Sequence, residues 1–505
     1  MAYVLSSKQM KAMDKRTIKD FGLPARILME NAGNGCADYL LATYPEMKSG
    51  MVTILHGCGN NSGDGFVIAR KLFLAGINVT LVQVHCSKFS EESKANYDLC
   101  TKLNILMLEC LDETCLGELV HITTNSCMII DAVFGIGFHG ELSDYLKEVF
   151  EHANISNKPR IAIDIPSGIN ADTGAGDNDA FRATETLCIH APKFGSILNQ
   201  GRIYSGKLTT IKISIFTDYK DNASLSLVID EENCEYPTRY EQANKGDYGR
   251  VVIIGGSPGF SGSAAMAAKA ALRSGAGYCY LMSRPEMEAH YYHLSPEIMF
   301  RAIPEYPETG LPDEEKLREL LKQADSVVIG CGMGLDAYAQ NLLKIVLQYC
   351  KARIVVDADA IRLIADNKDL QQYLNRRYIV LTPHLGEFSR LCGKSIKAIY
   401  MDTIGELTKY IKKTKAQILL KGYTTVFAND NYLLFNTSGN DGLATGGSGD
   451  VLAGIIGSFL AQGLYIPTAA INASYLLGKT AEKLSETRLP ASILPSDIID
   501  NLFVK

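Results

Sequence analysis

The chain has 505 residues, more than one hydrophobic core usually supports, so two or three domains are expected. Hydrophobic residues make up 47% and charged residues 21%, as in ordinary globular proteins, which argues against wholesale disorder. The net charge of -6 argues against a basic nucleic-acid-binding surface, although local backbone amides can still bind a small anion.

The cysteines and the N-terminal segment indicate a cellular compartment. Thirteen cysteines lie at irregular spacing without a CxxC pair, which favours reduced thiols over a disulfide framework or a zinc site. Residues 1–17 lack a long apolar core behind a basic start, so no secretory signal is expected. No apolar run approaches the ~18 residues that a membrane span requires. We therefore expect a cytoplasmic protein with neither membrane nor nucleic-acid partners.

Apolar runs alternate with amphipathic segments through the first 216 residues. Residues 7–21 predict a helix, because Met10, Met13 and Ile18 recur at helical spacing. The later apolar runs are mostly continuous, as expected for parallel strands covered by helices on both faces. The predicted strands are 51–56, 78–84, 127–131, 160–165, 186–189 and 208–213. With right-handed crossovers they form a Rossmann-like, doubly wound sheet, which we assign to a domain at 1–216.

Polar sequence at 217–238 predicts a linker, and a second α/β domain is expected at 239–505. The predicted strands of this domain are 249–254, 278–282, 326–330, 354–357, 378–382, 418–421, 424–428 and 432–435. The last two strands resemble a hairpin that turns at residues 429–431. Helices are predicted at 448–461, 468–484 and 496–503.

A glycine-rich turn, GCGNNSGDG at 57–65, joins the first predicted strand to a helix. Such a turn exposes backbone amides at the helix N-terminus, where an anion is favoured, although it can also be purely structural. Asn60, Asn61 and Asp64 make this turn unusually polar for a structural turn. We therefore expect a ligand site here.

Two carboxylates end neighbouring strands of the first domain. Asp131 follows the run 128–130, and Asp164 follows the run 161–163. In an open α/β sheet, ligands bind beyond the carboxyl ends of the strands. An acidic pair among amides and hydroxyls suits a hard cation, and a carboxylate there can also move a proton.

The motifs LMENAG (28–33), GCGNNSGDGFVIAR, DAVFGIGFHG and DIPSGINADTG together resemble the NAD(P)H-hydrate epimerase family over residues 1–216. The resemblance implies a potassium ion held by Asn61, Asp131 and Ser167, with Asp164 as the catalytic acid–base residue. It also implies that the hydrated dinucleotide is bound by Asn60, Asn61, Ser62, Gly63, Asp64, Gly135, Ile136, Gly137, Phe138, His139, Gly140, Glu141 and Asp164.

Two residues of this domain need separate comment. Ser62 stands where the family usually has glycine, which we expect to narrow the phosphate approach slightly. Lys193 lies in the segment HAPKFG, where it is either a phosphate contact or a solvated loop lysine.

A second glycine-rich segment, NDGLATGGSGD at 440–450, leads directly into a predicted helix. Amides at a helix N-terminus can stabilise charge on a phosphoryl group in transfer, whereas a glycine-rich helix start can also lack any chemistry. Asp450 lies where it can accept a proton from an attacking hydroxyl. No GKS or GKT follows the glycines, so this is not a Walker loop.

This segment, together with NKGDYG (244–249), GGSPGFSGSAAMAAKAALRSGAGY, GCGMG (330–334), VVDADA, TPHLGEFSRL and LKGYTTV, resembles the ADP/ATP-dependent NAD(P)H-hydrate dehydratases of the ribokinase-like superfamily. The resemblance implies hydrate contacts at Ala264, Gly332, His384 and Asp450, the last of them catalytic. It implies nucleotide contacts at Lys421, Gly422, Tyr423, Thr424, Thr425, Ser448 and Gly449. Cys331 departs from the family, which usually has proline there. His384 has an alternative reading as a cap of the following helix.

Together the two resemblances predict a bifunctional repair enzyme for hydrated NADH and NADPH. The first domain is expected to interconvert the R and S epimers, and the second to dehydrate the S epimer with ADP or ATP, accompanied by Mg²⁺. The alternative is a ribokinase-like kinase of a vitamin precursor fused to a non-catalytic nucleotide-binding module. We also expect a homo-oligomer.

Overall fold

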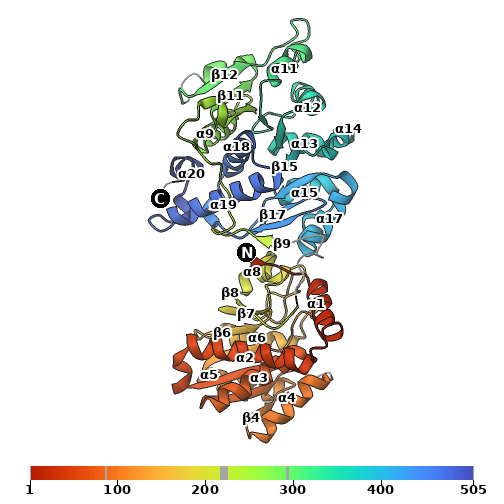
Figure 1. The fold of residues 1–505 in the computed structure, drawn as a ribbon, viewed down its shortest axis with the longest axis vertical. Helices are drawn as coiled ribbons and strands as arrows, with labels where there is room; N and C mark the ends of the chain where they lie inside the picture. The colour runs from red at the N-terminus through yellow and green to blue at the C-terminus, as the bar shows by residue number, and fades with distance from the viewer. Residues whose placement is uncertain (1, 86–87, 217–225, 292–294, 504–505) are drawn as a thin grey trace. The chain divides into compact units, whose positions relative to one another are not determined.

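The computed structural model describes residues 2–85, 88–216, 226–291 and 295–503. The chain divides into two compact units, one of Tyr3–Ala223 and one of Ser224–Lys505 together with Met1–Ala2 (Figure 1). The two-domain α/β fold expected from the sequence is confirmed. Among the described residues, no helix is long and apolar enough to cross a membrane.

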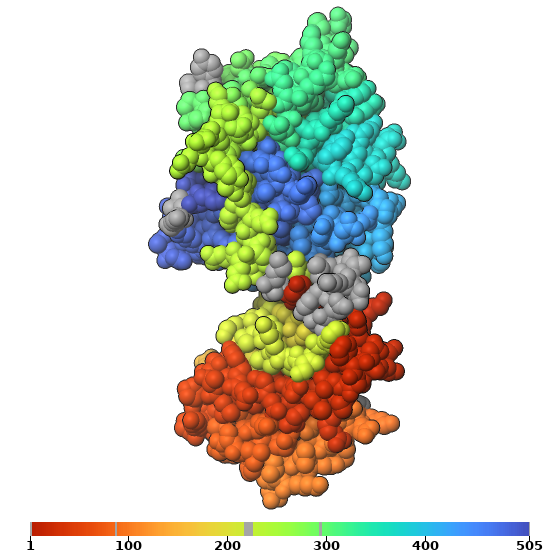
Figure 2. Space-filling view, in the orientation of Figure 1, coloured from red at the N-terminus to blue at the C-terminus, as the bar shows by residue number. Residues whose placement is uncertain are grey.

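The unit of Tyr3–Ala223, called here the N-terminal unit, is built on a parallel sheet. The strands of the first half of the chain are β1 (Ala2–Tyr3), β2 (Met51–His56), β3 (Asn78–Gln83), β4 (Leu106–Glu109), β5 (Ser126–Ala132), β6 (Arg160–Ile163), β7 (Glu185–Ile189) and β8 (Lys207–Ile211). The helices are α1 (Ser7–Lys19), α2 (Ala25–Thr43), α3 (Asn60–Leu74), α4 (Glu91–Lys102), α5 (Leu116–Asn125), α6 (Asp144–Asn154), α7 (Phe194–Ile197) and α8 (Asn199–Tyr204). In Figure 2 the red and orange segments, which include α1 and α2, form much of this unit's visible face.

Of these eight strands, all but β1 form the sheet of this unit, in the order β4-β3-β2-β5-β6-β7-β8, and every pairing is parallel. Helices cover both faces, because neighbouring residues of one strand enter different cores: Ile54 belongs to one hydrophobic cluster and Leu55 to the other. The direction of winding reverses between β2 and β5. A crevice therefore opens beyond the carboxyl ends of these two strands, where ligands bind in folds of this kind.

The other unit, called here the C-terminal unit, contains a larger sheet. Its strands are β9 (Ser226–Val228), β10 (Arg250–Ile254), β11 (Tyr278–Ser283), β12 (Ile298–Ala302), β13 (Ser326–Ile329), β14 (Arg353–Val356), β15 (Ile379–Leu381), β16 (Gln417–Leu420), β17 (Thr425–Ala428) and β18 (Leu433–Asn436). Its helices are α9 (Ser261–Arg273), α10 (Glu288–Tyr291), α11 (Glu314–Leu321), α12 (Ala337–Tyr349), α13 (Ala358–Asp366), α14 (Lys368–Gln371), α15 (Leu385–Cys392), α16 (Ile396–Met401), α17 (Thr403–Thr414), α18 (Ser448–Ala461), α19 (Ile466–Leu484) and α20 (Pro495–Asn501).

The strands of this sheet run in the order β9-β18-β17-β16-β15-β14-β13-β10-β11-β12. Strands β10 to β16 pair in parallel, and β16, β17 and β18 pair antiparallel, so the predicted hairpin is confirmed. Helix α18 packs closely on α9, since a side chain at Gly454 would meet the carbonyl oxygen of Ala267 at 2.1 Å. The winding reverses between β10 and β13, as it does between β2 and β5.

Four strands, β1, β4, β9 and β12, were not expected from the sequence, and each lies at a sheet edge or outside the regular α/β repeat. The segment LMLE of β4 and the segment IMFRA of β12 are largely half-exposed, and their apolar runs, 105–108 and 298–300, are short. Strand β9 lies inside the segment expected to be a linker and pairs with β18. Residues 217–225 of that segment lie outside the described residues. The domain boundaries stay a prediction.

The expectation that all cysteines are reduced thiols is wrong at one pair. Cys110 and Cys115 form a disulfide across the short connection from β4 to α5. A CxxxxC spacing in a long chain gave no signal for this bond. Other cysteines, including Cys36, Cys279 and Cys331, are free and buried.

Candidate functional sites

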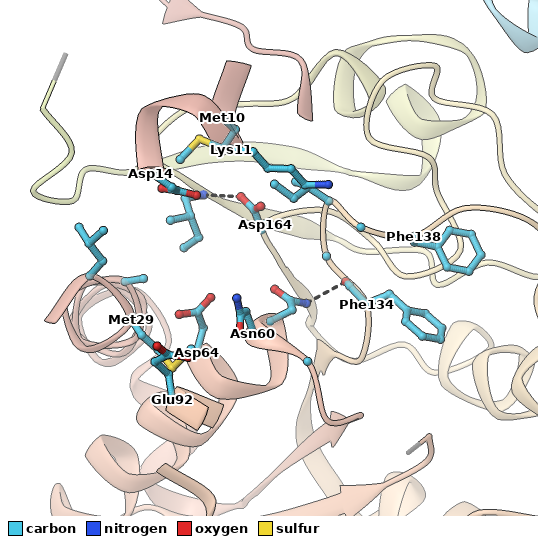
Figure 3. A pocket seen from close by; sticks show the side chains of 18 of the residues that line it. Met10, Lys11, Asp14, Met29, Asn60, Asp64, Glu92, Phe134, Phe138 and Asp164 are labelled. Carbon is cyan, nitrogen blue, oxygen red and sulfur yellow. Dashed lines mark hydrogen bonds between the residues drawn. The ribbon is translucent and has the colours of Figure 1, made fainter. Parts of the chain in front are cut away.

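A pocket of about 770 Å³ opens in the N-terminal unit at the crevice between β2 and β5 (Figure 3). This volume suits a dinucleotide-sized or smaller ligand, because ligand pockets commonly measure about 300–1,000 Å³. The sequence-predicted residues that line it are Asn60, Asn61, Asp64, Gly135, Ile136, Gly137, Phe138, His139 and Asp164. Gly140 and Glu141 follow in the same loop and are exposed. The pocket therefore brings together residues from the ends of three strands.

Helix α3 begins in the glycine-rich turn and directs Asn60, Asn61 and Asp64 into the pocket. Burial raises the pKa of Asp64 well above its usual value, and the nearby Asp164 and Asp14 carboxylates raise it further. Ser62 points away from the pocket. Its hydroxyl accepts from the Gly57 amide and donates to the Ala132 carbonyl, so it is directed into the unit, and the expected narrowing of the phosphate approach stays a prediction. Gly63 packs against Met29 inside the unit.

The three residues expected to hold potassium lie close together beneath the pocket. The Ser167 hydroxyl donates to Asp131 Oδ1 at 2.6 Å, and the Ser167 amide donates to Asp131 Oδ2 at 2.7 Å. Asn61 Nδ2 donates at 2.8 Å to the Phe134 carbonyl, and the Phe134 amide donates to the Ser167 hydroxyl at 2.8 Å. Side-chain and carbonyl oxygens thus converge on one buried spot.

This oxygen-rich set fits a hard monovalent cation. Asp131 is fully buried, and the hydrogen bonds it accepts come from neutral donors, Ser167 and Val133. Burial raises the pKa of Asp131 to about 6, against the opposing effect of those hydrogen bonds. A cation beside the carboxylate would supply the missing positive charge, and oxygen donors are the ligands that such ions prefer.

Asp164 directly follows β6 with a backbone φ of 68°, a left-handed conformation that is uncommon outside glycine. Its Oδ1 accepts from Lys193 Nζ and from the Ile189 amide. The Lys193 side chain is fully buried and also donates to the carbonyls of Ile189 and Ala191. Lys193 is thus an internal partner of Asp164. Of the two alternatives, the solvated loop lysine is wrong, and the phosphate contact stays a prediction for a lysine that lines the pocket.

Helix α1 contributes pocket residues that the sequence did not single out as ligand contacts. Met10, Asp14 and Ile18 lie one turn apart on one side of the helix, and all three line the pocket. Burial raises the pKa of Asp14 to about 6, while Lys193 lowers it and Asp164 raises it. The sequence signal for Asp14 as a pocket residue is its place between Met10 and Ile18, where a carboxylate interrupts apolar residues at helical spacing.

In the C-terminal unit, α18 starts at Ser448 behind Gly447, whose φ of 104° favours glycine. Asp450 lies in the first turn and accepts from the Ser263 hydroxyl of α9 at 2.5 Å. Burial raises the pKa of Asp450, and the Ser263 hydrogen bond acts against this rise. A carboxyl with a raised pKa beside free helix amides can accept a proton from a hydroxyl that attacks a phosphoryl group.

Lys421 lies beside this helix start. Its Nζ is 2.7 Å from Asp357 Oδ1, and it would be 3.2 Å from a side chain placed on Gly449. Burial alone would lower the pKa of Lys421, but Asp357 and Glu387 raise it overall. A fixed positive charge therefore sits at the predicted nucleotide loop, and the Asp357 carboxylate is further held by the Thr382 hydroxyl at 2.8 Å.

Among the described residues, one group has metal-ligand spacing, namely Cys331, Asp357 and Asp450. Mg²⁺ prefers six oxygen ligands, so the thiol and the ammonium of Lys421 make this group a poor Mg²⁺ cage. Any Mg²⁺ would have to be held largely by the phosphates of the nucleotide.

The remaining predicted residues of this unit surround the same helix start. Ser448 is buried and its hydroxyl has no hydrogen-bond partner in the part of the chain described. Gly422 and Tyr423 are exposed, Thr424 is buried and Thr425 is half-buried. Ala264 is fully buried in the first turns of α9, and Gly332 follows β13 with a φ of 61°. These positions stay predictions as ligand contacts.

His384 caps α15, which is the alternative role that the sequence left open for it. Its Nδ1 accepts from the amides of Gly386 at 3.0 Å and Glu387 at 3.3 Å. The capping leaves Nε2 near Glu387, and the side chain is 61% exposed. The two readings are therefore compatible, because one ring nitrogen caps the helix and the other faces outward.

Fold and sites define a two-unit α/β enzyme whose ligand sites lie at the carboxyl ends of parallel strands. A family model described as NAD(P)H-hydrate dehydratase matches residues 251–503, and one described as YjeF-related protein N-terminus matches residues 25–195. The bifunctional NAD(P)H-hydrate repair enzyme Nnr of Moorella thermoacetica is 31% identical, over 99% of this chain and 96% of its own length. That of Salinibacter ruber is 31% identical over 98% and 95%.

The solved structure of a ribokinase-like superfamily protein from Enterococcus faecalis V583 aligns with 55% of this chain and 94% of its own, at 31% identity and a TM-score of 0.49. Because relatives of matching length exceed 30% identity over almost the whole sequence, the family is established. The chain belongs to the bifunctional NAD(P)H-hydrate repair enzymes.

Proposed function

We propose that the chain repairs NADH and NADPH that have been hydrated on the nicotinamide ring. The N-terminal unit is an isomerase that interconverts the R and S epimers of the hydrate. The C-terminal unit is a lyase that dehydrates the S epimer at the expense of ADP or ATP. The observation that carries this proposal is the buried Asp450 at the start of α18, beside Lys421, in a chain of this family.

In the C-terminal unit, Asp450 accepts the proton of the substrate hydroxyl as that oxygen attacks the terminal phosphoryl group. The Ser263 hydroxyl orients the Asp450 carboxylate, and the first amides of α18 stabilise charge on the phosphoryl oxygens. Lys421 supplies positive charge on the same side. Phosphate is a far better leaving group than hydroxide, so its departure restores the ring double bond.

The assignments around this centre belong to the same proposal. Ala264, Gly332 and His384 contact the hydrate, and the segment 421–425 with Ser448 and Gly449 binds the nucleotide. The unpartnered hydroxyl of Ser448 supports this, since a buried donor without a partner is costly unless a ligand accepts from it. Mg²⁺ accompanies the nucleotide phosphates.

In the N-terminal unit, Asp164 moves a proton at the hydrated carbon, and the residues that line the pocket bind the hydrate. Asn61, Asp131 and Ser167 hold potassium, which supplies a fixed positive charge near the bound anion. Support comes from the convergence of these oxygens under the pocket and from the absence of a charged donor among the hydrogen bonds to Asp131.

The test is incubation of the purified protein with mixed hydrate epimers and either ADP or ATP, following NADH absorbance and free phosphate together. We expect both epimers to be consumed, with one phosphate released per NADH restored. A phosphorylated product that accumulates without NADH would instead identify a kinase of the alternative kind. Omitting the nucleotide while following epimer ratios tests the N-terminal unit alone.

A further inference from the structure

The pocket of the N-terminal unit contains two carboxyl groups that the proposed epimerase site does not use, Asp14 and Glu92. Asp14 comes from α1, which lies before the segment matched by the N-terminal family model. Figure 3 shows the Asp14 carboxyl directed toward Asp164, while Asp64 reaches the same space from α3. Asp14 is thus a titratable group aimed at the proposed reaction centre.

The position of Asp14 is fixed by the way α1 is held. Ser6 caps the helix through a capping box with Gln9, and the Ser7 amide and hydroxyl both donate to Asp172. At the other end of the helix, the Phe216 amide donates to the Thr17 hydroxyl at 3.0 Å. These contacts anchor both ends of α1 to the unit, so that Asp14 is presented on a rigid element rather than on a mobile arm.

The chemistry of epimerisation calls for two proton-transfer groups. Hydration of a dihydronicotinamide leaves the hydroxyl on a ring carbon attached to nitrogen. Inverting that carbon requires the hydroxyl to leave from one face and water to return to the other. The leaving oxygen needs a proton donor, and the incoming water needs an acceptor at the same time.

Asp164 is suited to only one of these roles. Its Oδ1 is occupied by the Lys193 ammonium and the Ile189 amide, so these donors hold it as a carboxylate and hence as an acceptor. A second group must therefore carry the proton that the leaving hydroxyl takes. Asp14 and Asp64 share this space with Asp164, and Asp14 is the one of the two not already assigned to binding the hydrate.

We propose that Asp14 is a second catalytic proton-transfer residue of the epimerase site, a role that rests on the epimerase function proposed above. As the carbon–oxygen bond breaks, the Asp14 carboxyl gives its proton to the hydroxyl oxygen, and water leaves a ring that carries the positive charge on nitrogen and carbon. Water adds to the opposite face of that carbon and gives a proton to the Asp164 carboxylate. The proton then returns from Asp164 to Asp14, so both carboxyl groups regain their starting states. No electrons are gained or lost, so no net oxidation occurs.

The charged surroundings of Asp14 agree with this assignment. Lys11 on α1, Asp64 on α3, Asp164 and Lys193 face the same pocket, with Glu92 on α4 and His139 at its margin. Burial is the largest influence on Asp14 and raises its pKa to about 6, which keeps the group able to hold or release a proton near neutral pH.

The experiment compares Asp14→Asn, Asp14→Glu and the control Asp20→Asn with the wild type in the full-length protein. Asp20 is an exposed aspartate that ends the same helix. Epimer ratios are followed without nucleotide as a function of pH. We expect Asp14→Asn to lower kcat on the order of 10²–10⁴-fold with KM changed by less than about threefold, and Asp20→Asn to match the wild type.

The pH profile separates a catalytic role from a structural one. In the wild type, kcat/KM should fall above about pH 6, where Asp14 gives up its proton. In Asp14→Asn, kcat/KM should not fall in this pH range. Asp14→Glu should restore part of the rate and part of the fall in kcat/KM above about pH 6. Hydrogen exchange over residues 7–19 checks that α1 stays folded in Asp14→Asn. If α1 unfolds in that variant, the rate and pH profile of Asp14→Glu test the assignment instead. An active wild type whose rate and pH limb survive in Asp14→Asn overturns the assignment. A wild type that interconverts no epimers overturns the epimerase function itself.

Discussion

The two units build their sites on the same plan and use the buried lysine differently. In each, a sheet reverses its winding, helix amides meet strand ends, and a lysine pairs with an aspartate: Lys193 with Asp164, and Lys421 with Asp357. In the N-terminal unit the lysine holds Asp164, the proposed catalytic carboxyl, itself. In the C-terminal unit it pairs with a neighbour and leaves Asp450 to the neutral Ser263.

This difference matches the charge that each proposed reaction develops. Epimerisation passes through a positively charged ring, which a fixed carboxylate can stabilise. Phosphoryl transfer concentrates negative charge on oxygen, which a fixed ammonium and helix amides can stabilise. The residue with which the lysine pairs, more than the presence of a lysine, therefore determines the chemistry of each site.

The largest effect is expected at Asp450. Asp450→Asn keeps the shape of the side chain but cannot accept the hydroxyl proton, so dehydration should fall on the order of 10²–10⁴-fold while nucleotide binding persists. Phosphate release and calorimetric binding of ADP or ATP measure the two properties separately. Asp441→Asn, an exposed aspartate of the same loop, is the matched control. Turnover close to that of the control would remove Asp450 from the chemistry.

Asp164→Asn tests the other half of the comparison. With excess nucleotide and mixed epimers, the variant should dehydrate only the epimer that the C-terminal unit accepts, and stop near that epimer's initial share. The wild type should run to completion, and both should start at the same rate because Asp450 is untouched. The assay belongs at a pH where spontaneous epimerisation is slow.

The control for this variant is Asp179→Asn, an exposed aspartate of the same unit. It should consume the whole mixture as the wild type does. If Asp164→Asn also consumes the whole mixture at the wild-type rate, the proton is moved elsewhere and Asp164 is structural.

Much of this arrangement was accessible from the sequence, because strand ends and glycine-rich helix starts carry local signals. Asp131, Asp164 and Asp450 each follow or open an element whose periodicity is clear, so their approach to a sheet edge could be predicted. Lys193 and Asp14 could not be placed in this way. Their roles depend on how a loop and a helix fold back over the sheet, which no local pattern encodes.

Other differences have equally physical causes. Strands β4 and β12 lie at sheet edges, where side chains are half-exposed and the apolar runs are only four and three residues long. Strand β9 sits in polar sequence and is recruited by its partner β18. The direction of the Ser62 hydroxyl is set by the Gly57 amide just after β2 and by the Ala132 carbonyl at the end of β5, which outweigh its position in a glycine-rich turn.

Lys193→Met should destabilise the N-terminal unit, because it leaves the Asp164 carboxylate without a cation in a place that is 9% exposed. Removing one partner of a buried ion pair costs about 3–5 kcal/mol. The double variant Lys193→Met with Asp164→Asn should recover most of this loss, since no unpaired charge remains. Hydrogen exchange of β6 and β7 reports the local free energy of opening.

Lys421→Met is the matched control for locality. It removes the equivalent lysine of the C-terminal unit and should leave exchange in β6 and β7 unchanged. If the double variant is as unstable as Lys193→Met alone, packing of the lysine stem, and not its charge, holds the Asp164 loop.

The smallest expected effect concerns the pH dependence of Asp131. In the unfolded chain its carboxyl has the ordinary pKa of 3.8, and burial raises the pKa in the folded unit to about 6. The folded state therefore binds the proton more tightly, so the resulting stability is complete below pH 3.8 and is lost as the pH rises through 6. A difference of about two pKa units corresponds to about 3 kcal/mol.

In potassium-free buffer, hydrogen exchange in β5 measures the free energy of opening. Between pH 4 and pH 7.5 this free energy should thus fall by about 3 kcal/mol more in the wild type than in Asp131→Asn. The exposed-site variant Asp38→Asn should follow the wild type, since its carboxyl lies outside this cluster. Adding potassium should then restore stability at pH 7.5 to the wild type alone, because binding to the folded state is favoured only where the carboxylate is present. Parallel curves for wild type and Asp131→Asn would show that another group titrates, and potassium that stabilises both proteins equally would place the cation away from Asp131.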